Sequence, residues 1–308
     1  MKFIPAFSPY TQKPTSQTGS ARGIGPNATG ISLTHLIRGH FEIHTWLLLG
    51  AALQAILTFL PFTRKYVVLV VFVILGVKAT KQLLMVFGLR KNIYMEGVLK
   101  GKWAPLIPNE DGSFDREAKN KTPGGGEICV VHICSRVNHP LGLLAPGFKE
   151  VGKYSTKMYL DLEARAEYYG YLGSSSYISS SDRTTLSESL EVIYFKSREH
   201  LARFAEEAAH RDGWNWWNKH NKEGKVNHIS INHEVFCIPE GKWEAIYINF
   251  PPTLLGNTSH PIKDKDGKTK WANPLVDSRK GRLRTQRGRM GLSIGNDYEK
   301  YKDDPYEV

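Results

Sequence analysis

Hydrophobic and polar residues are distributed unevenly along this chain. Two apolar runs, 46–62 and 66–77, follow one another with only a short polar turn between them. A helix that spans a bilayer needs about 20 mostly apolar residues. The first run approaches this length without a charged side chain, and the second reaches it if it continues past Lys78 and Lys81. The pattern predicts a transmembrane helical hairpin over 43–89, although the β-branched second run would also fit a buried strand.

Basic residues predict the orientation of this hairpin. The turn has only Arg64 and Lys65, whereas the flanks are richer in basic residues, which are Arg22, Arg38, Lys78, Lys81, Arg90, Lys91, Lys100 and Lys102. Positive residues favour the cytoplasmic side, so both flanks and the soluble domain are expected to face the cytoplasm, with the endoplasmic reticulum as a candidate membrane. The amphipathic segment 90–103 is expected to lie in the membrane interface, with Trp103 among the lipid headgroups. More than forty residues precede the apolar runs, which argues against a cleaved signal peptide.

The rest of the chain alternates short apolar runs with amphipathic segments. Strands are predicted at 127–135, 170–178, 189–195, 226–238 and 242–250, and helices at 146–168 and 197–221. This order is the split βαβ pattern of a ferredoxin-like fold, with the final strand added through a hairpin at Pro239-Glu240-Gly241. The fold class is therefore α+β, with helices on one face of an antiparallel sheet. The other face would need cover from a second copy, the anchor or a ligand.

Composition shifts divide the chain into five parts. They are a disordered N-terminal segment (1–42), the hairpin (43–89), a juxtamembrane segment and linker (90–126), the ferredoxin-like domain (127–255) and a basic, poorly ordered tail (256–308).

The net charge of +11 could indicate nucleic-acid binding, but its distribution favours a membrane. The excess lies beside the hairpin and in the cluster 279–289, where it would contact anionic lipid. No nucleic-acid-binding motif accompanies it. The three cysteines, Cys129, Cys134 and Cys237, fall within strand-like runs without metal-ligand spacing, so we expect buried free thiols in a reducing compartment.

The strand 226–238 carries the most informative polar residues. Alternation places His233 on an apolar face and turns Glu234 to the opposite face, so the two cannot form an adjacent acid–base pair in a regular strand. His233 is a candidate base or axial haem ligand, and a satisfied core histidine is the alternative. The same alternatives apply to His132.

Other side chains could complete a pocket. Tyr247 and Asn249 share a strand face with Trp243 and could hold an oxyanion, although core packing of the aromatic rings is equally compatible. His210, Trp214 and Trp217 lie at helical spacing. The full set of candidates is His233, His210, Asn249, Tyr247 and Glu234 for catalysis, and His132, Trp214, Trp217, Trp243 and Phe148 for substrate binding. No GxGxxG, Walker A, HExxH, GxSxG or CxxCH motif is found, so nicotinamide, nucleotide, zinc and serine-hydrolase chemistry lack support.

Three segments, 138–150, 194–218 and 228–256, resemble the fumagillin-type polyketide monooxygenase family, formerly a domain of unknown function. That family is related to the antibiotic-biosynthesis monooxygenases. The resemblance implies a dimeric α+β barrel that oxygenates a lipophilic metabolite, often in secondary-metabolite biosynthesis. In the antibiotic-biosynthesis relatives the substrate carbanion itself reduces oxygen, without flavin, haem or metal. Asn232 stands where family motifs usually carry Trp before His-Glu, which puts the shape of the pocket in doubt.

We therefore expect a membrane-anchored monooxygenase that oxidises a lipophilic polyketide- or terpenoid-like intermediate with molecular oxygen and no bound cofactor. Its expected partners are the substrate, membrane lipids and a second copy of the chain, and not nucleic acid. Two alternatives stay open. One is a haem enzyme of the related dimeric-barrel type, similar to aldoxime dehydratases, with His233 as axial ligand. The other is a non-catalytic carrier of a lipophilic ligand.

Overall fold

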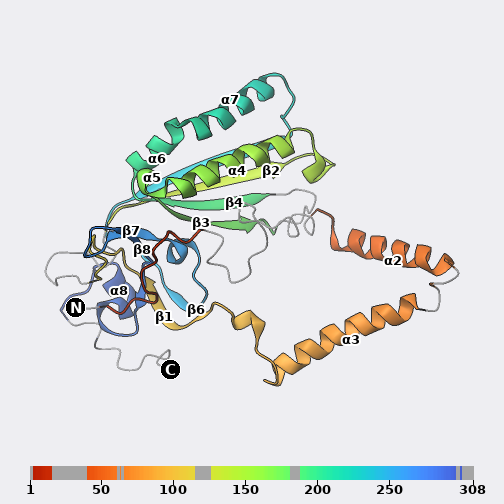
Figure 1. The fold of residues 1–308 in the computed structure, drawn as a ribbon, viewed down its shortest axis with the longest axis horizontal. Coiled ribbons are helices and arrows are strands. Elements are labelled where there is room, and N and C mark those ends of the chain that lie inside the picture. Colours follow the sequence, from red (N-terminus) through yellow and green to blue (C-terminus); the bar gives the residue numbers. More distant parts are fainter. Residues whose placement is uncertain are drawn as a thin grey trace.

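A four-stranded antiparallel sheet with helices on one face forms the upper part of the molecule as drawn in Figure 1. The computed structural model describes residues 3–15, 40–60, 63, 66–114, 126–180, 188–295 and 299. The strands are β2 (Ile128–Val137), β3 (Tyr171–Ile178), β4 (Ser189–Phe195) and β5 (Ile229–Ile238), in the order β3-β4-β2-β5. One helical connection joins β2 to β3 and another joins β4 to β5, which is the ferredoxin-like arrangement. The predicted α+β class is confirmed for this part of the chain.

Each predicted helix of this domain is interrupted once. The first comprises α4 (Phe148–Ala164) and α5 (Ala166–Tyr169), and the second comprises α6 (Arg198–Glu206) and α7 (Ala208–Lys222). The two interruptions face each other, because Arg165 lies 3.4 Å from Glu207 in an ion pair. Glu207 also accepts a hydrogen bond from the hydroxyl of Tyr168. Contacts between the helices thus accompany both breaks, and such contacts leave no periodic signal in the sequence.

The hydrophobic core lies between the sheet and these helices. Alternate residues of the central strands point toward the helices, as period-2 patterning requires. The buried side chains of this core include Cys129, Val131, Ile193 and Phe195 from the sheet and Tyr159, Leu162, Tyr169 and Phe204 from the helices.

The predicted hairpin after β5 is wrong. β6 (Tyr247–Phe250) pairs with β1 (Leu99–Pro105) in a separate three-stranded sheet of order β6-β1-β9, where β9 is Leu275–Asp277. The chain leaves the edge of the main sheet after β5 because Trp243 packs across the sheet face opposite the helices, against Val130 and Val192. The chain itself therefore covers part of that open face. The exposed side chains of Phe236 and Tyr177 lie on another part of it.

The poorly ordered tail predicted after residue 255 is also wrong for the residues described. This region forms η3 (Leu254–Asn257), β7 (His260–Lys263), β8 (Thr269–Ala272), β9, η4 (Gly281–Arg284) and α8 (Gln286–Arg289). Its few apolar side chains are buried, among them Trp271, Leu275 and Leu283. Two arginines of the predicted lipid-binding cluster are held in ion pairs: Arg289 binds Glu244 at 2.6 Å and Arg279 binds Asp277 at 2.6 Å.

The N-terminal segment is ordered where it is described. Pro5 forms a bridge with Val276, and Tyr10 forms one with Trp271, so residues 3–15 run as a strap along the second sheet and β8. This corrects the prediction of a disordered segment for these residues, while 16–39 lie outside the described part of the chain. The predicted interfacial segment 90–103 is corrected as well, because its last residues belong to β1 and Trp103 pairs with Asp277 in that sheet.

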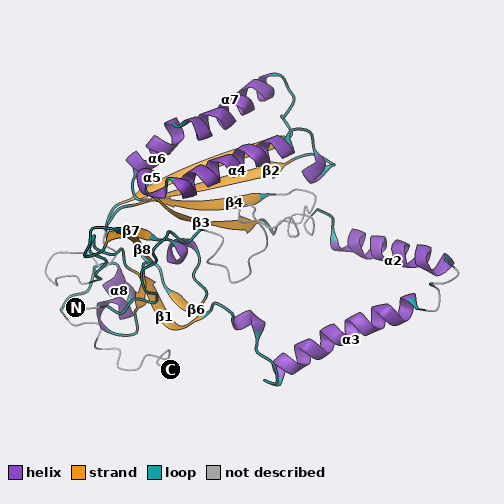
Figure 2. Cartoon of the chain, viewed as in Figure 1, coloured by secondary structure: helices purple, strands orange, loops and turns teal. Residues whose placement is uncertain are grey.

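Two apolar helices extend away from both sheets (Figure 2). They are α2 (Ile43–Phe59) and α3 (Val67–Val86), and neither buries a residue, so the alternative of a buried strand is wrong. Within the described residues, α3 is the one helix long and apolar enough to cross a membrane, judged by length and composition. The 17-residue α2 is shorter.

The cysteines are free thiols, as expected, but Cys237 is exposed rather than buried. It lies directly opposite Cys129 on the neighbouring strand, with 3.5 Å between the sulfur atoms. Burial, followed by the contact with Cys237, raises the pKa of the Cys129 thiol to about 12. At neutral pH Cys129 is therefore protonated and a poor nucleophile.

Candidate histidine site

The edge strand β5 presents different chemistry on its two faces. Its register with β2 places His233 opposite Ile133 and Glu234 opposite His132. Ile133 packs against the core beneath the helices, so His233 lies on the helix-covered face and Glu234 on the open face. The strand is regular here, as the alternation predicted, and the adjacent residues His233 and Glu234 do not form a pair.

His210, in the first turn of α7, lies close to His233. Its Nδ1 lies 3.0 Å from the carbonyl oxygen of Ala205. A carbonyl oxygen can only accept, so Nδ1 carries the hydrogen and the neutral ring keeps its lone pair on Nε2. Burial lowers the pKa of His210 below its usual value; the bond to Ala205 partly opposes this, and the charge of His233 lowers the pKa further. At neutral pH His210 is therefore an uncharged imidazole with one basic nitrogen.

The surroundings of this histidine pair, His210 and His233, are apolar. The ring of Phe204 packs edge-on against His210, with 5.6 Å between centroids. On β5, Ile231 and Val235 flank His233 on the same face and are 42% and 43% exposed. The helices therefore leave an apolar surface uncovered beside a neutral base. That combination suits removal of a proton from a lipophilic molecule.

A second pair occupies the open face. His132 and Glu234 are cross-strand neighbours, with 4.0 Å between Nδ1 and the carboxylate oxygen. The ring of Phe236 packs edge-on against His132 at 5.3 Å between centroids. Both members of this pair are substantially exposed, so their attraction is weak.

The predicted oxyanion-binding residues, Tyr247 and Asn249, lie elsewhere, on β6. The hydroxyl of Tyr247 donates to the carbonyl of Thr253 at 2.9 Å and accepts from the backbone N–H of Gly256 at 2.8 Å. The side-chain oxygen of Asn249 accepts from the backbone N–H of Gly101 at 2.8 Å. These bonds hold the second sheet and η3 together, and the structure does not bring Tyr247 and Asn249 to the histidine pair.

The predicted aromatic residues differ in burial and location. Trp243 is buried and donates to the carbonyl of Gly126 at 3.2 Å, so it is a core residue. Trp214 is 52% exposed, while Trp217 on α7 and Phe148 at the start of α4 are half-buried.

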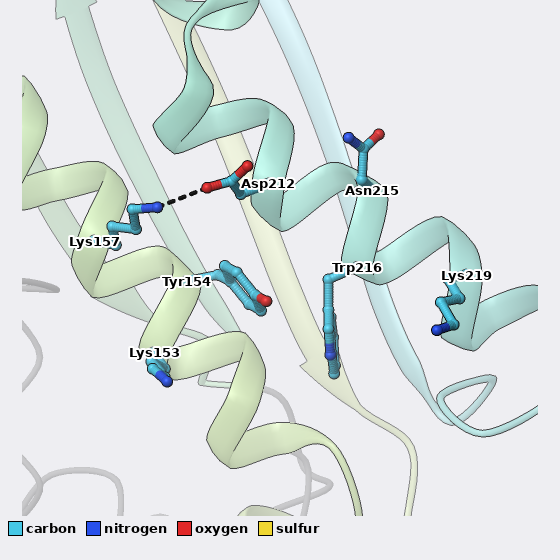
Figure 3. Close-up of a pocket in the computed structure, with 7 residues that line it drawn as sticks. All are labelled: Lys153, Tyr154, Lys157, Asp212, Asn215, Trp216 and Lys219. Carbon is cyan, nitrogen blue, oxygen red and sulfur yellow. Dashed lines mark hydrogen bonds and ion pairs between the residues drawn. The ribbon is translucent and has the colours of Figure 1, made fainter.

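The aromatic residue of α7 that packs on α4 is Trp216, which is not among the predicted site residues. It faces Tyr154 across a groove of about 650 Å³ between the two helices (Figure 3). Gly213, one turn earlier, is the sequence feature that could have indicated this contact between α7 and α4. A side chain there would meet Met158 and Tyr154, so Gly213 and Trp216 mark the side of α7 that contacts α4.

Among the residues that the structure describes, no three His, Cys, Asp or Glu side chains gather closely enough to hold a metal ion. The residue proposed as a haem ligand, His233, is exposed, and its charge acts on His210.

Several solved structures share similarity with about a third of the chain. A conserved protein of unknown function from Bacteroides thetaiotaomicron is 11% identical, with 37% of this chain and 100% of that chain covered and a TM-score of 0.26. A candidate antibiotic biosynthesis monooxygenase from Nitrosomonas europaea is also 11% identical, with 37% and 91% covered and a TM-score of 0.24.

The sequence relatives are more informative. Residues 128–255 match the model of the family described as monooxygenase af470-like. Monooxygenase af470 of Aspergillus fumigatus is 31% identical over 265 residues, which are 85% of this chain and 92% of that protein. The resemblance read from the sequence is thereby confirmed. This chain belongs to the af470-like monooxygenase family and is an oxidoreductase.

Proposed function

We propose that this monooxygenase oxidises a lipophilic polyketide- or terpenoid-like molecule at a membrane surface, with His210 as the base. The observation that carries the proposal is the state of His210. Its hydrogen is held on Nδ1 by Ala205, its pKa is lowered, and exposed Ile231 and Val235 lie on the neighbouring strand. A neutral imidazole beside an apolar surface can accept a proton from an acidic carbon without first losing one itself.

The proposed reaction uses molecular oxygen as the oxidant and the substrate as the source of electrons. His210 removes a proton from an activated CH₂ group, and the carbanion transfers its electrons to O₂ to form a C–O bond. Loss of water from the resulting peroxide breaks the O–O bond and leaves a carbonyl group. The CH₂ group and O₂ thus become C=O and H₂O, and no further reductant or bound cofactor is needed.

His233 is proposed as a positioning residue rather than the base. Its charge lowers the pKa of His210, so it helps to keep that imidazole neutral as the pH falls. Its ring also lies among the exposed apolar residues that the substrate would contact.

Membrane attachment through two helices is supported by the pairing of the segments on either side of them. The strap 3–15 precedes α2 and β1 follows α3, yet both pair with β9, through Val276 and Asp277 respectively. A single crossing by α3 would place the strap and β1 on opposite sides of the bilayer. If α3 crosses, the segment with α2 must cross back. A helix of 17 residues is about 26 Å long, close to the hydrocarbon thickness of about 30 Å.

The test begins with a strain that lacks the encoding gene, from which the accumulated lipophilic intermediate is isolated. Full-length protein in nanodiscs is then given this intermediate, and oxygen uptake is measured. We expect consumption of oxygen with the wild-type protein and a loss of roughly 10²- to 10⁴-fold in kcat for His210→Gln, the usual contribution of a general base.

The matched control is His220→Gln. His220 lies on the same helix and makes the same type of bond from Nδ1 to a backbone carbonyl, that of Trp216 at 2.8 Å. Its variant is expected to keep wild-type kcat. Wild-type oxygen uptake by a correctly folded His210→Gln protein would remove His210 as the base. Absence of oxygen uptake by the wild-type protein would favour a carrier. A Soret absorption band in purified active protein would instead support the haem alternative.

A further inference from the structure

The groove between α4 and α7 has the chemistry of a second binding site. It is lined by Lys153, Tyr154 and Lys157 of α4 and by Asp212, Asn215, Trp216 and Lys219 of α7, and it encloses about 650 Å³ (Figure 3). We propose that it binds a lipophilic small molecule that carries a carboxylate. The site is separate from the histidine pair, which contributes no residue to its lining.

Two aromatic rings form its apolar walls. Tyr154 and Trp216 project from facing helices into the space between them, with 5.5 Å between centroids and 37° between planes. Both rings line the groove, and Trp216 also stacks on His220 with 4.6 Å between centroids. Gly213 permits this arrangement, because a side chain at that position would meet Met158 and Tyr154. A flat or aliphatic ligand could therefore rest against both rings.

The charges in the groove are not balanced. Lys157 forms an ion pair with Asp212 at 2.7 Å, which closes the end of the groove where these two residues lie. Lys153 and Lys219 also line the groove and form no ion pair with any residue that the structure describes. The groove therefore holds three ammonium groups against one carboxylate. A bound carboxylate would complement this excess of positive charge and could accept a hydrogen bond from a lysine of the lining.

The groove is also close to the proposed membrane anchor. The strands lie behind the helices in Figure 3, so the groove opens on the outer surface of the helix layer. α4 begins just after η2 (Gly142–Leu144), and His40, three residues before the start of α2, lies against Gly142. A molecule that partitions into the bilayer would therefore meet this end of the domain first. The apolar walls favour such a molecule over a purely ionic ligand, and the volume admits a small molecule.

The experiment uses full-length protein in phosphatidylcholine nanodiscs and 2-naphthoate as the probe, followed by isothermal titration calorimetry. We expect saturable binding with one site per chain. The wild-type protein should bind the uncharged analogue 2-naphthalenemethanol about tenfold more weakly than naphthoate. The double variant Lys153→Gln/Lys219→Gln should bind naphthoate about tenfold more weakly than the wild type does. In both cases two partly exposed ion pairs are lost. Trp216→Phe should weaken binding by a few-fold through reduced ring contact.

Two matched variants serve as controls. Lys222→Gln removes a lysine from the last turn of α7 that does not line the groove, and Trp214→Phe alters an exposed ring of the same helix. Both should bind naphthoate as wild type does. Equal affinity for the alcohol, no effect of the double lysine variant, or no saturable binding would each overturn the proposal. Loss of naphthoate binding in phosphatidylserine nanodiscs would assign the groove to lipid headgroups and overturn the small-molecule site.

Discussion

Glu191 of β4 is a carboxyl group in the interior, between the sheet and α4. The hydroxyl of Tyr159 donates to it at 3.2 Å and that of Ser176 at 2.5 Å. Burial nevertheless raises its pKa from the ordinary value of 4.5 to about 7, because the two hydrogen bonds offset only part of the desolvation. The folded protein therefore holds a proton on Glu191 that the unfolded chain releases between these two pH values.

Glu191→Gln should change the pH dependence of stability. In the wild type the folded state binds the extra proton between pH 4.5 and 7, so stability is fully present below pH 4.5 and falls as the pH rises to about 7. The shift corresponds to at most about 3 kcal/mol. The glutamine keeps an acceptor for Tyr159 and Ser176 but has no proton to lose. In thermal unfolding, the stability of the variant relative to the wild type should increase as the pH rises from 4.5 to 7. A stability difference that stays constant from pH 4 to 8 would contradict this prediction.

Tyr247→Phe tests whether this residue is structural. The change leaves the N–H of Gly256 without its partner and should cost about 1–3 kcal/mol of stability. Because Tyr247 lies apart from the histidine pair, kcat should stay at the wild-type value. Tyr177→Phe is the control, since its hydroxyl bonds only to the Thr253 side chain at an exposed position and should cost less. A lower kcat with unchanged melting temperature would restore Tyr247 as a candidate for catalysis.

The pH profile of oxygen uptake tests the role of His233. The base must be unprotonated, so kcat should rise with pH through the pKa of His210, which lies below 6.5. His233→Gln removes the neighbouring charge and should shift this rise to higher pH. An unchanged profile would mean that His233 does not influence His210.

Sequence reasoning was reliable for residues whose orientation depends on local geometry. The opposite faces of His233 and Glu234 follow from the period of a strand, and the structure confirms them. The partners of Tyr247 and Asn249 could not be predicted in this way, because they depend on pairing between β6 and β1. Asn249 and its partner Gly101 are 148 positions apart, and no local pattern records such a contact.

At the scale of elements, the strap 3–15 should contribute strongly to stability despite its position at the end of the chain. Phe3 is 9% exposed and packs with Leu106, Phe114, Val276 and Leu283, whereas neighbouring Ile4 is 67% exposed. Phe3→Ala should cost about 3 kcal/mol or more, the usual effect of deleting a buried aromatic ring. Ile4→Ala should cost little and serves as the matched control. Equal melting temperatures for the two variants would mean that the strap does not hold the second sheet.

The elements that could be predicted share one property, which is an apolar content high enough to show a period. β2 and β4 are such runs, and they appear where they were expected. β7, β8 and β9 have only three or four residues each, and their polar surroundings hide them. β7 pairs with β8, β9 pairs with β1, and the strap bridges β8 and β9, so the same sequence read locally looks like a basic tail.

At the scale of the whole molecule, the two apolar helices form an insertion into a single folded body. The strap on one side and β1 on the other both pair with β9. A body that contains both flanks can lie on only one side of a bilayer. The proposal that the two helices cross together therefore depends more on this topology than on their hydropathy.

Cysteine accessibility can test this topology directly. In a background with Cys129, Cys134 and Cys237 changed to Ala, single cysteines are placed at Ser8 in the strap, Thr63 between the helices, and Lys268 between β7 and β8. In sealed microsomes with the cytoplasmic face outward, an impermeant maleimide should label positions 8 and 268, because basic flanks favour the cytoplasm. Position 63 should react only after detergent is added. Labelling of position 63 in intact vesicles would place both helices on the membrane surface. Protection of both positions 8 and 63, with position 268 labelled, would mean a single crossing by α3 and would contradict the pairing of the strap with β9.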